Sequence, residues 1–398
     1  MEKTWVNISN VLFFQEGPGV RNTQYTTEGV KLLNVANLVD GKVDLSTSDR
    51  YISEDEAYGK YKHFLCDAGD FIIASSGIKV EYIDKKMGFV DESMLPLCMN
   101  TSTIRFKVLD DNQLRIRYFM YYLKSQHFKN QLFKQITGSA QLNYGPSHLK
   151  KMIMPLINLS KQDEIIACMD KVQSIIEMRQ QELVKLDDLI KARFVEMFGN
   201  PVYNEKGWET KPLLEMGKCK NGMNFRYDES GVVINCLGVG DFKDLSIIGD
   251  TTLLPTVSLN EMPSEEYLLK NDDIVFVRSN GNKALVGRSV AVYPEDTPTT
   301  FSGFCIRYRK DDQAVTIPYL LRVLKTDSIR MKMIGRGANI QNLNQQILRK
   351  LVIPIPPIEL QNQFADFVHQ VDKSKVAVQK ALDETQLLFN SLMQEYFG

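Results

Sequence analysis

Residues 149–162 read LKKMIMPLINLSKQ, and residues 348–361 read LRKLVIPIPPIELQ. The second stretch lies 199 positions after the first, and the alignment extends without a gap from 138–199 to 337–398. Thirteen of these 62 aligned positions are identical, whereas unrelated chains would share about one in sixteen by composition. The chain therefore contains an internal repeat.

The segments in front of these two copies resemble each other more faintly. Trp5 corresponds to Trp208 near the start of each half, and Ile104-Arg105-Phe106 corresponds to Ile306-Arg307-Tyr308. Each half thus has a variable block, in which the two halves differ, followed by a better-kept block, in which they are more similar. Two tandem domains without special geometry are the simpler alternative. The repeat predicts four pieces, at residues 1–155, 156–200, 201–355 and 356–398.

Each better-kept block is predicted to form one long helix, because apolar residues recur at alternating three- and four-residue steps. Neither Gly nor Pro occurs in 162–198 or 361–397, which gives helices roughly 50–55 Å long. Proline-marked segments precede both. Arg179, Lys375 and Thr385 interrupt the pattern. The predicted seam residues are Ile165, Met169, Val172, Ile176, Leu183, Leu186, Ile190, Phe364, Val368, Val371, Val378, Leu382 and Phe389, with Met197 and Tyr396 continuing the pattern.

A single amphipathic helix of this length cannot bury its apolar stripe alone. The other helix is the economical partner, in an antiparallel pair, while packing of each helix on its own domain is the alternative. The variable blocks mix strands, such as 71–74 and 274–277, with helices at 118–133 and 318–334. The predicted class is α+β: two mixed α/β domains separated by two long antiparallel helices, in a pseudo-twofold repeat.

Composition and motifs predict no catalytic and no metal site. The chain carries a net charge of −1 and six scattered cysteines without a CxxC pair, which fits a reducing cytoplasm. Neither a secretory signal nor a long apolar span is found. The phosphate-loop pattern and the G-x-S-x-G pattern are both missing from the sequence. Asn200-Pro201-Val202-Tyr203 is similar to the N-P-P-Y loop of adenine methyltransferases but follows a long predicted helix, which favours a linker turn.

Polar loops recur at equivalent places in both halves. Arg, Lys, Asn and Gln can bond to base edges, and Ser and backbone amides suit phosphates. Glycines in the loops allow close approach to a surface. Plain solvated turns are the alternative. The candidate DNA-binding residues are Arg21, Ser75, Ser76, Lys79, Gln141, Asn143, Tyr144, Arg226, Arg278, Asn280, Lys283, Arg336, Asn339, Gln341 and Asn342.

The whole layout resembles the specificity subunit of type I restriction–modification systems. The Trp-led block starts and the two proline-marked stretches quoted above carry the resemblance, although the first stretch has Asn158-Leu159 where the second has Pro357-Ile358. The resemblance implies two target recognition domains, each reading half of a bipartite DNA site, and a helix pair that sets the gap. It also implies double-stranded DNA, two modification subunits and restriction subunits as partners. S-adenosylmethionine, ATP and Mg would belong to those partners, and this chain would bind no cofactor.

Two other functions stay open at this point. A fused methyltransferase and nuclease would need a cofactor-binding turn and a carboxylate cluster, neither of which the sequence displays. A scaffold that binds only protein through its helices and domains would be indifferent to DNA sequence.

Overall fold

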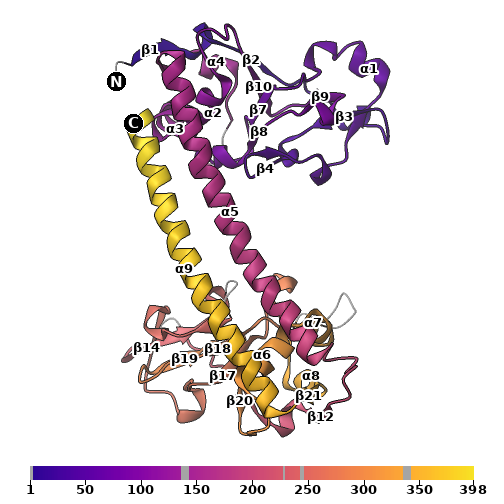
Figure 1. Cartoon of the computed structure of the whole chain (residues 1–398), viewed down its shortest axis with the longest axis vertical. Coiled ribbons are helices and arrows are strands. Elements are labelled where there is room, and N and C mark those ends of the chain that lie inside the picture. Colours follow the sequence, from indigo (N-terminus) through magenta and orange to yellow (C-terminus); the bar gives the residue numbers. More distant parts are fainter. Residues whose placement is uncertain (1–2, 136–142, 227–228, 243–245, 335–341) are drawn as a thin grey trace. The chain divides into compact units, whose positions relative to one another are not determined.

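The computed structural model describes residues 3–135, 143–226, 229–242, 246–334 and 342–398. The chain forms two compact units, unit 1 from residues 1–180 and 380–398 and unit 2 from residues 181–379. The long helices α5 (Leu159–Phe198) and α9 (Ile358–Phe397) each contribute to both units (Figure 1). Each unit therefore contains one variable block and parts of both helices.

Both long helices form as predicted, and each begins three residues earlier than its uninterrupted segment. Each has 40 residues, which corresponds to about 60 Å, and their first residues are 199 positions apart, as in the sequence repeat. The side chain of Asn158 accepts a hydrogen bond from the amide of Lys161 at 2.9 Å and caps the start of α5. Pro155 and Pro354 lie in short strands, β11 (Ile153–Leu156) and β21 (Val352–Ile355), whereas Pro356 and Pro357 follow β21 directly.

Unit 1 contains small sheets and short helices around an aromatic core. Its strand pairings are antiparallel except for β3–β9, which is parallel. The sheets are β2 (Leu12–Glu16)–β10 (Thr103–Val108)–β7 (Phe71–Ala74)–β8 (Met87–Phe89), β6 (Tyr51–Ile52)–β3 (Val30–Leu33)–β9 (Leu97–Met99), β4 (Leu38–Val39)–β5 (Lys42–Val43) and β1 (Thr4–Asn7)–β11. The short helices are α1 (Glu54–Tyr58), α2 (Ile116–Lys124), α3 (Gln126–Gln135) and α4 (Pro146–Leu149).

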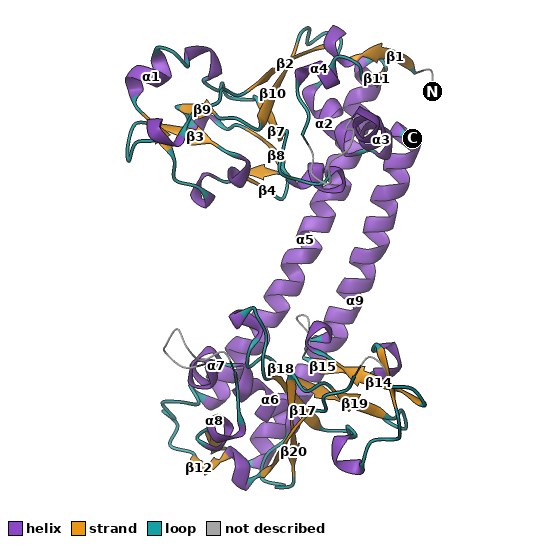
Figure 2. Cartoon of the chain, turned by 180° about the vertical axis from the view of Figure 1, so that it is seen from behind, coloured by secondary structure: helices purple, strands orange, loops and turns teal. Residues whose placement is uncertain are grey.

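Unit 2 repeats this plan with a wider central sheet (Figure 2). The sheets are β13 (Gly217–Asn221)–β20 (Cys305–Lys310)–β17 (Asp273–Val277)–β18 (Ser289–Val292)–β15 (Ile247–Ile248), β16 (Thr256–Leu259)–β14 (Val232–Leu237)–β19 (Thr299–Phe301) and β12 (Glu209–Pro212)–β21. The helices are α6 (Ile317–Lys325), α7 (Asp327–Ile334) and α8 (Gln345–Arg349). The predicted strands at 71–74 and 274–277 correspond to β7 and β17.

The helices predicted at 118–133 and 318–334 are each divided in two, which corrects the prediction of single helices. Ser125 adopts an extended conformation between α2 and α3, and its hydroxyl accepts a hydrogen bond from the amide of Phe128 at 3.2 Å. Thr326 is likewise extended between α6 and α7, with its hydroxyl donating to the carbonyl of Val323 at 2.7 Å. Serine and threonine favour such caps over helix interiors, and the second helix contacts the first in both units.

The two long helices pack against each other in each unit, and they run antiparallel. In unit 2, Lys375 pairs with Asp187 at 2.7 Å, while the rings of Phe364 and Phe194 lie 5.5 Å apart further along. In unit 1, the Tyr396 hydroxyl lies 3.9 Å from the thiol sulfur of Cys168. Most predicted seam residues are buried, and Leu183, Leu186, Val368, Val378 and Leu382 are partly exposed. Both helices also contact the globular parts, as in the Tyr118–Phe397 ring contact at 5.2 Å.

A buried glutamine joins each globular part to a long helix. The amide group of Gln162 donates to the carbonyls of Gln113 and Ile157 at 2.8 Å, and its oxygen accepts from the amide of Arg115 at 2.8 Å. Gln361 makes the same three bonds in unit 2, and both side chains are fully buried. This identity within the sequence repeat is thus explained by its role in packing.

Candidate nucleic-acid interface

In unit 1, two polar loops that the sequence placed far apart lie side by side. Ser76 and Asn143 form an isolated antiparallel bridge, and the amide of Tyr144 donates to the carbonyl of Ser75 at 3.0 Å. The first loop directly follows β7, and the second precedes α4. Hydrogen bonding between their backbones therefore brings the two loops together.

A third loop, after β2, joins them. The amide of Gly17 donates to the carbonyl of Thr103 at 2.8 Å, and the neighbouring Ser102 places its hydroxyl 2.6 Å from that of Ser76. A Cβ at Gly17 would lie 2.1 Å from the carbonyl oxygen of Asn100, so the approach requires glycine. We call residues 17–21, 75–79, 100–103 and 143–144 loop cluster 1.

Unit 2 has the same arrangement, which we call loop cluster 2 (residues 221–226, 278–283, 302–304 and 342–343). Ser279 and Asn342 form the bridge that corresponds to Ser76 and Asn143, and the amide of Leu343 donates to the carbonyl of Arg278 at 2.8 Å. A Cβ at Gly222 would lie 2.1 Å from the carbonyl oxygen of Ser302. The predicted loops therefore meet in both units, at equivalent positions of the repeat.

The predicted residues differ in how much of each side chain reaches solvent. Six are exposed and three are half-buried, so these nine could touch a ligand. The exposed ones are Arg21, Lys79, Asn143, Arg226, Lys283 and Asn342, and the half-buried ones are Ser76, Arg278 and Asn280. Gln141, Arg336, Asn339 and Gln341 lie outside the described residues.

Two of the predicted contact residues are structural instead. Tyr144 is 2% exposed, and its hydroxyl donates to the carbonyl of Ala74 at 3.0 Å. Burial raises the pKa of Tyr144 well above its usual value. Ser75 is 1% exposed, with its hydroxyl 3.5 Å from the carboxylate of Glu16. Because neither side chain reaches the surface, both act by holding the loops in place from inside the unit.

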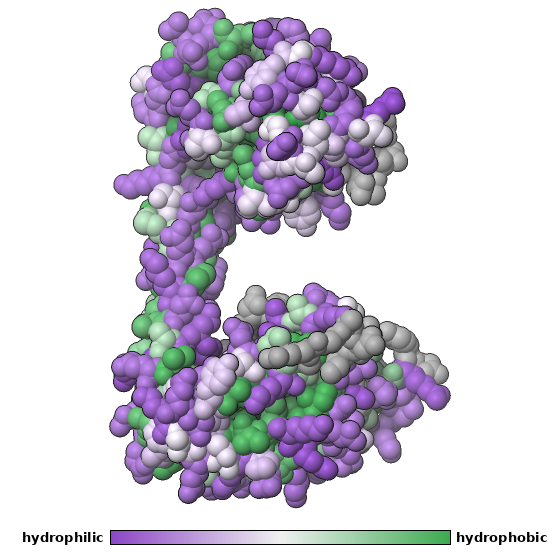
Figure 3. Space-filling model, turned by 90° about the vertical axis from the view of Figure 1, so that its right-hand side faces the viewer, coloured by the Kyte–Doolittle hydropathy of each residue, from purple (hydrophilic) through white to green (hydrophobic). Residues whose placement is uncertain are grey.

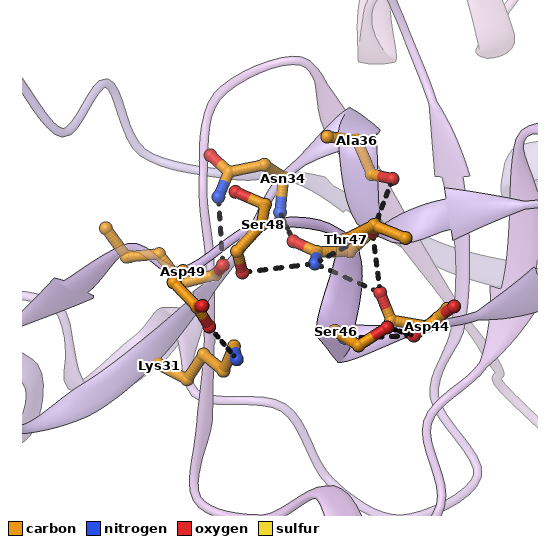
Figure 4. Close-up of polar contacts among 10 residues, drawn as sticks. Lys31, Asn34, Ala36, Asp44, Ser46, Thr47, Ser48 and Asp49 are labelled. Atoms are coloured by element: carbon orange, nitrogen blue, oxygen red, sulfur yellow. Dashed lines mark hydrogen bonds and ion pairs between the residues drawn. The ribbon is translucent and has the colours of Figure 1, made fainter. Parts of the chain in front are cut away.

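Buried asparagines support loop cluster 1, and the sequence analysis did not assign them a role. Asn100 donates to the side-chain oxygen of Asn34 at 2.8 Å, and Asn34 donates to the carbonyl of Leu32 at 2.9 Å. Figure 4 shows Asn34 beside the loop whose Thr47 hydroxyl donates to the carbonyl of Ala36 at 2.8 Å. The similarity of Leu33-Asn34-Val35 to Ile234-Asn235-Cys236 is the signal that could have found them, since Asn235 likewise bonds a carbonyl, that of Leu254, at 3.1 Å.

Unit 2 also has a cavity of about 390 Å³ where α5, α6 and α9 meet. Its walls are mostly apolar, with charged groups from Asp187, Arg322, Lys325, Asp372 and Lys375. Burial lowers the pKa of Lys325 to about 8 and raises that of Asp372. The Lys325 ammonium donates to the hydroxyl of Ser246 at 2.8 Å.

Within the described part of the chain, three or more His, Cys, Asp or Glu residues never come together in a way that could hold a metal ion. Burial raises the pKa of the thiols of Cys66, Cys98, Cys219, Cys236 and Cys305. No described helix is both long and apolar enough to cross a membrane. The segment 200–203 forms a turn after α5, with the Asn200 side chain accepting from the amide of Val202 at 2.9 Å.

The sequence model of the type I restriction modification DNA specificity domain matches residues 27–187 and again residues 205–385. The chain belongs to this family. The two matches follow the internal repeat, and together they cover most of the chain. Membership confirms the resemblance that the repeat architecture suggested, with two copies of the specificity domain in the chain.

Individual relatives agree with this assignment. The chain is 24% identical over 294 residues to the StySPI specificity subunit of Salmonella potsdam, a match covering 70% of this chain and 63% of that protein. It is 23% identical over 186 residues to the MjaVIII specificity subunit of Methanocaldococcus jannaschii, covering 46% of this chain and 42% of that one. The chain thus spans less than two thirds of the length of these relatives.

Two solved structures share the fold. The S subunit of a type I restriction–modification system from M. genitalium superposes with a TM-score of 0.54 at 17% identity, covering 100% of this chain and 96% of that one. A chain from a structural study of complex assembly in a type I system superposes with a TM-score of 0.59 at 16% identity, covering 99% and 97%. Similarity at this level confirms the α+β class with its two long helices. The division at residues 155, 200 and 355 stays a prediction.

Proposed function

We propose that this chain is the DNA-reading subunit of a type I restriction–modification complex and has no catalytic site of its own. Each variable block reads one half of a bipartite, asymmetric DNA site. The observation that carries the proposal is the pair of loop clusters. Separate polar loops meet at the same place in both units, bridged by Ser76–Asn143 in one and by Ser279–Asn342 in the other.

The chemistry of the loop clusters suits duplex DNA. In the major groove, Arg278 can donate two hydrogen bonds to guanine O6 and N7, and Asn342 can donate one bond to adenine N7 while accepting one from its amino group. Exposed lysines such as Lys79 suit phosphates. The small net charge of −1 supplies little non-specific attraction by itself. Modification subunits that bind the DNA phosphates would supply the missing attraction, because phosphate contacts dominate the affinity for DNA.

The long helices carry several exposed apolar residues. Val184 is 61% exposed, Val376 70% and Leu387 66%. On the face shown in Figure 3, hydrophilic side chains cover the helices, with single hydrophobic residues among them. We propose that two modification subunits dock there and that restriction subunits join that core. S-adenosylmethionine, ATP and Mg would be bound by those subunits.

Exchange of one domain tests the proposal. A complex is reconstituted with modification subunits, and residues 206–335 are replaced by the equivalent segment of another family member. Methylation-site sequencing should then show one changed half-site and one unchanged half-site. A complex that methylates the same sequence after the exchange would contradict DNA reading by this chain and favour the scaffold function. Binding of S-adenosylmethionine to the purified chain, measured by calorimetry, would favour the fused enzyme.

Single substitutions separate reading from positioning. Arg278→Ala should relax the preference at one base pair of the second half-site, at a cost of about 1–3 kcal/mol. Lys79→Ala should weaken binding similarly for all sequences and reduce its salt dependence. An Arg278→Ala complex with unchanged preference at every position would remove this residue from the reading set.

A further inference from the structure

An exposed aromatic residue stands among the polar loops of unit 2. Phe304 lies in the turn between β19 and β20, and 60% of it is exposed. The same turn belongs to loop cluster 2, next to the loops that carry Asn224 and Arg278. Single exposed apolar residues are common on protein surfaces, so the exposure alone assigns no role.

The backbone of Phe304 is held firmly. Its carbonyl accepts hydrogen bonds from the amides of Arg278 at 2.8 Å and Ser279 at 3.3 Å, and its amide donates to the Ser302 hydroxyl at 3.3 Å. The preceding Gly303 donates to the carbonyl of Met223 at 2.6 Å. The turn is thus fixed by two neighbouring loops while its aromatic side chain projects into solvent.

Unit 1 has a different side chain at the equivalent position of its turn. The carbonyl of Ser102 accepts from the amide of Ser75 at 2.8 Å, as that of Phe304 accepts from Arg278. Ser102 uses its hydroxyl to contact the hydroxyl of Ser76 at 2.6 Å. The two loop clusters therefore share a backbone arrangement but present a hydroxyl in one case and an aromatic ring in the other.

We propose that Phe304 contacts the C5-methyl group of a thymine in the half-site read by unit 2. The inference rests on the proposed function. The thymine methyl is the apolar feature of the major-groove edge and a known partner for Phe. Protein-binding hot spots are usually ringed by further contacts that exclude water. Polar groups adjoin the backbone of this turn instead: the side-chain oxygen of Asn224 lies next to Gly303, and the amides of Arg278 and Ser279 bond to the Phe304 carbonyl.

Deoxyuridine substitution tests this contact, because it removes only the methyl group. The second half-site is first assigned by the domain exchange described above. Duplexes are then prepared with deoxyuridine in place of each thymine of that half-site, one at a time. The reconstituted complex should lose about fourfold in affinity at one position, which corresponds to about 0.8 kcal/mol for one buried carbon. The Phe304→Ala complex should bind more weakly and show no loss at that position.

Tyr203→Ala is the matched control, since Tyr203 is 75% exposed but lies in the turn after α5, outside both loop clusters. This variant should respond to deoxyuridine like the unchanged complex. The proposal is overturned if deoxyuridine weakens binding of the Phe304→Ala complex at every thymine by the same factor as it weakens binding of the unchanged complex. A second half-site without any A·T pair would also overturn it. Weaker assembly of Phe304→Ala with the modification subunits, measured without DNA by size exclusion, would assign the ring to a protein contact instead. In each case, continued methylation of a bipartite site would leave the proposed function intact.

Discussion

Replacing Gln361 with leucine should destabilise unit 2 by about 3 kcal/mol. The fully buried side chain donates to the carbonyls of Ala314 and Pro356 and accepts from the amide of Thr316, each at 2.8 Å. Leucine has a similar size but can make none of these bonds. Three backbone groups then lose their partner, at about 1 kcal/mol each.

Urea unfolding measures this loss. A denaturant dependence of about 1–3 kcal/mol per molar converts 3 kcal/mol into a lower midpoint by roughly 1–3 M. Hydrogen exchange read by mass spectrometry should locate the change, because amide protection should fall around Thr316 and at the start of α9. Gln162→Leu should produce an equal loss in unit 1, where the same three bonds occur.

Gln363→Leu provides the control for Gln361→Leu. Gln363 lies two residues further along α9 and is exposed, so the same chemical change there should alter stability by less than about 0.5 kcal/mol. If both variants unfold at the same urea concentration, the buried glutamine does not anchor the helix, and the reasoning is refuted.

Three more predictions follow from the helices and from buried charges. Matched insertions of four residues after Gln180 and after Gln379 add about 6 Å of helix, and methylation-site sequencing should show a gap longer by about two base pairs with both half-sites unchanged; an unaltered gap would exclude a ruler role. Lys325→Met should stabilise unit 2 at pH 7 relative to Lys373→Met, an exposed control outside the cavity. The pKa of Lys325 is lowered to about 8 in the folded chain. The destabilisation caused by its charge is therefore full below pH 8 and disappears as the pH rises toward the unfolded pKa near 10.4. If the urea midpoints of Lys325→Met and the unchanged chain differ equally at pH 7 and above pH 10, this prediction is contradicted. Asp273→Ala leaves Arg309 without the carboxylate that it contacts at 2.7 and 2.8 Å and should cost about 3 kcal/mol, measured by urea unfolding, whereas a loss no larger than that of Asp296→Ala at an exposed position would contradict it.

Periodicity and repetition were sufficient to predict the long helices, because their apolar spacing is a local property of the sequence. The pairing of β10 with β2 and β7 could not be predicted from the sequence, because strand partners far apart in the chain are selected by packing. The breaks at Ser125 and Thr326 were missed for a related reason. A single cap residue within an apolar pattern ends a helix only when tertiary contacts stabilise the turn that follows it.

The candidate site was predicted in part. Loops were found because polar residues recur at equivalent places, and the bridge between Ser76 and Asn143 explains why two loops per half were needed. Burial separated Tyr144 from its neighbour Asn143, a distinction that one-dimensional sequence does not carry. The exposure of Phe304 is not predictable from the sequence, because an aromatic residue beside a strand is usually part of the core.

The division of the chain into units has a consequence for its synthesis. Unit 2 is one uninterrupted stretch, 181–379, whereas unit 1 needs residues 380–398, including Phe397, which is fully buried and packs on the ring of Tyr118. During translation, where segments fold as they emerge, the globular part made first therefore waits for the last helix turns to close its core. The globular part made second is able to finish before it.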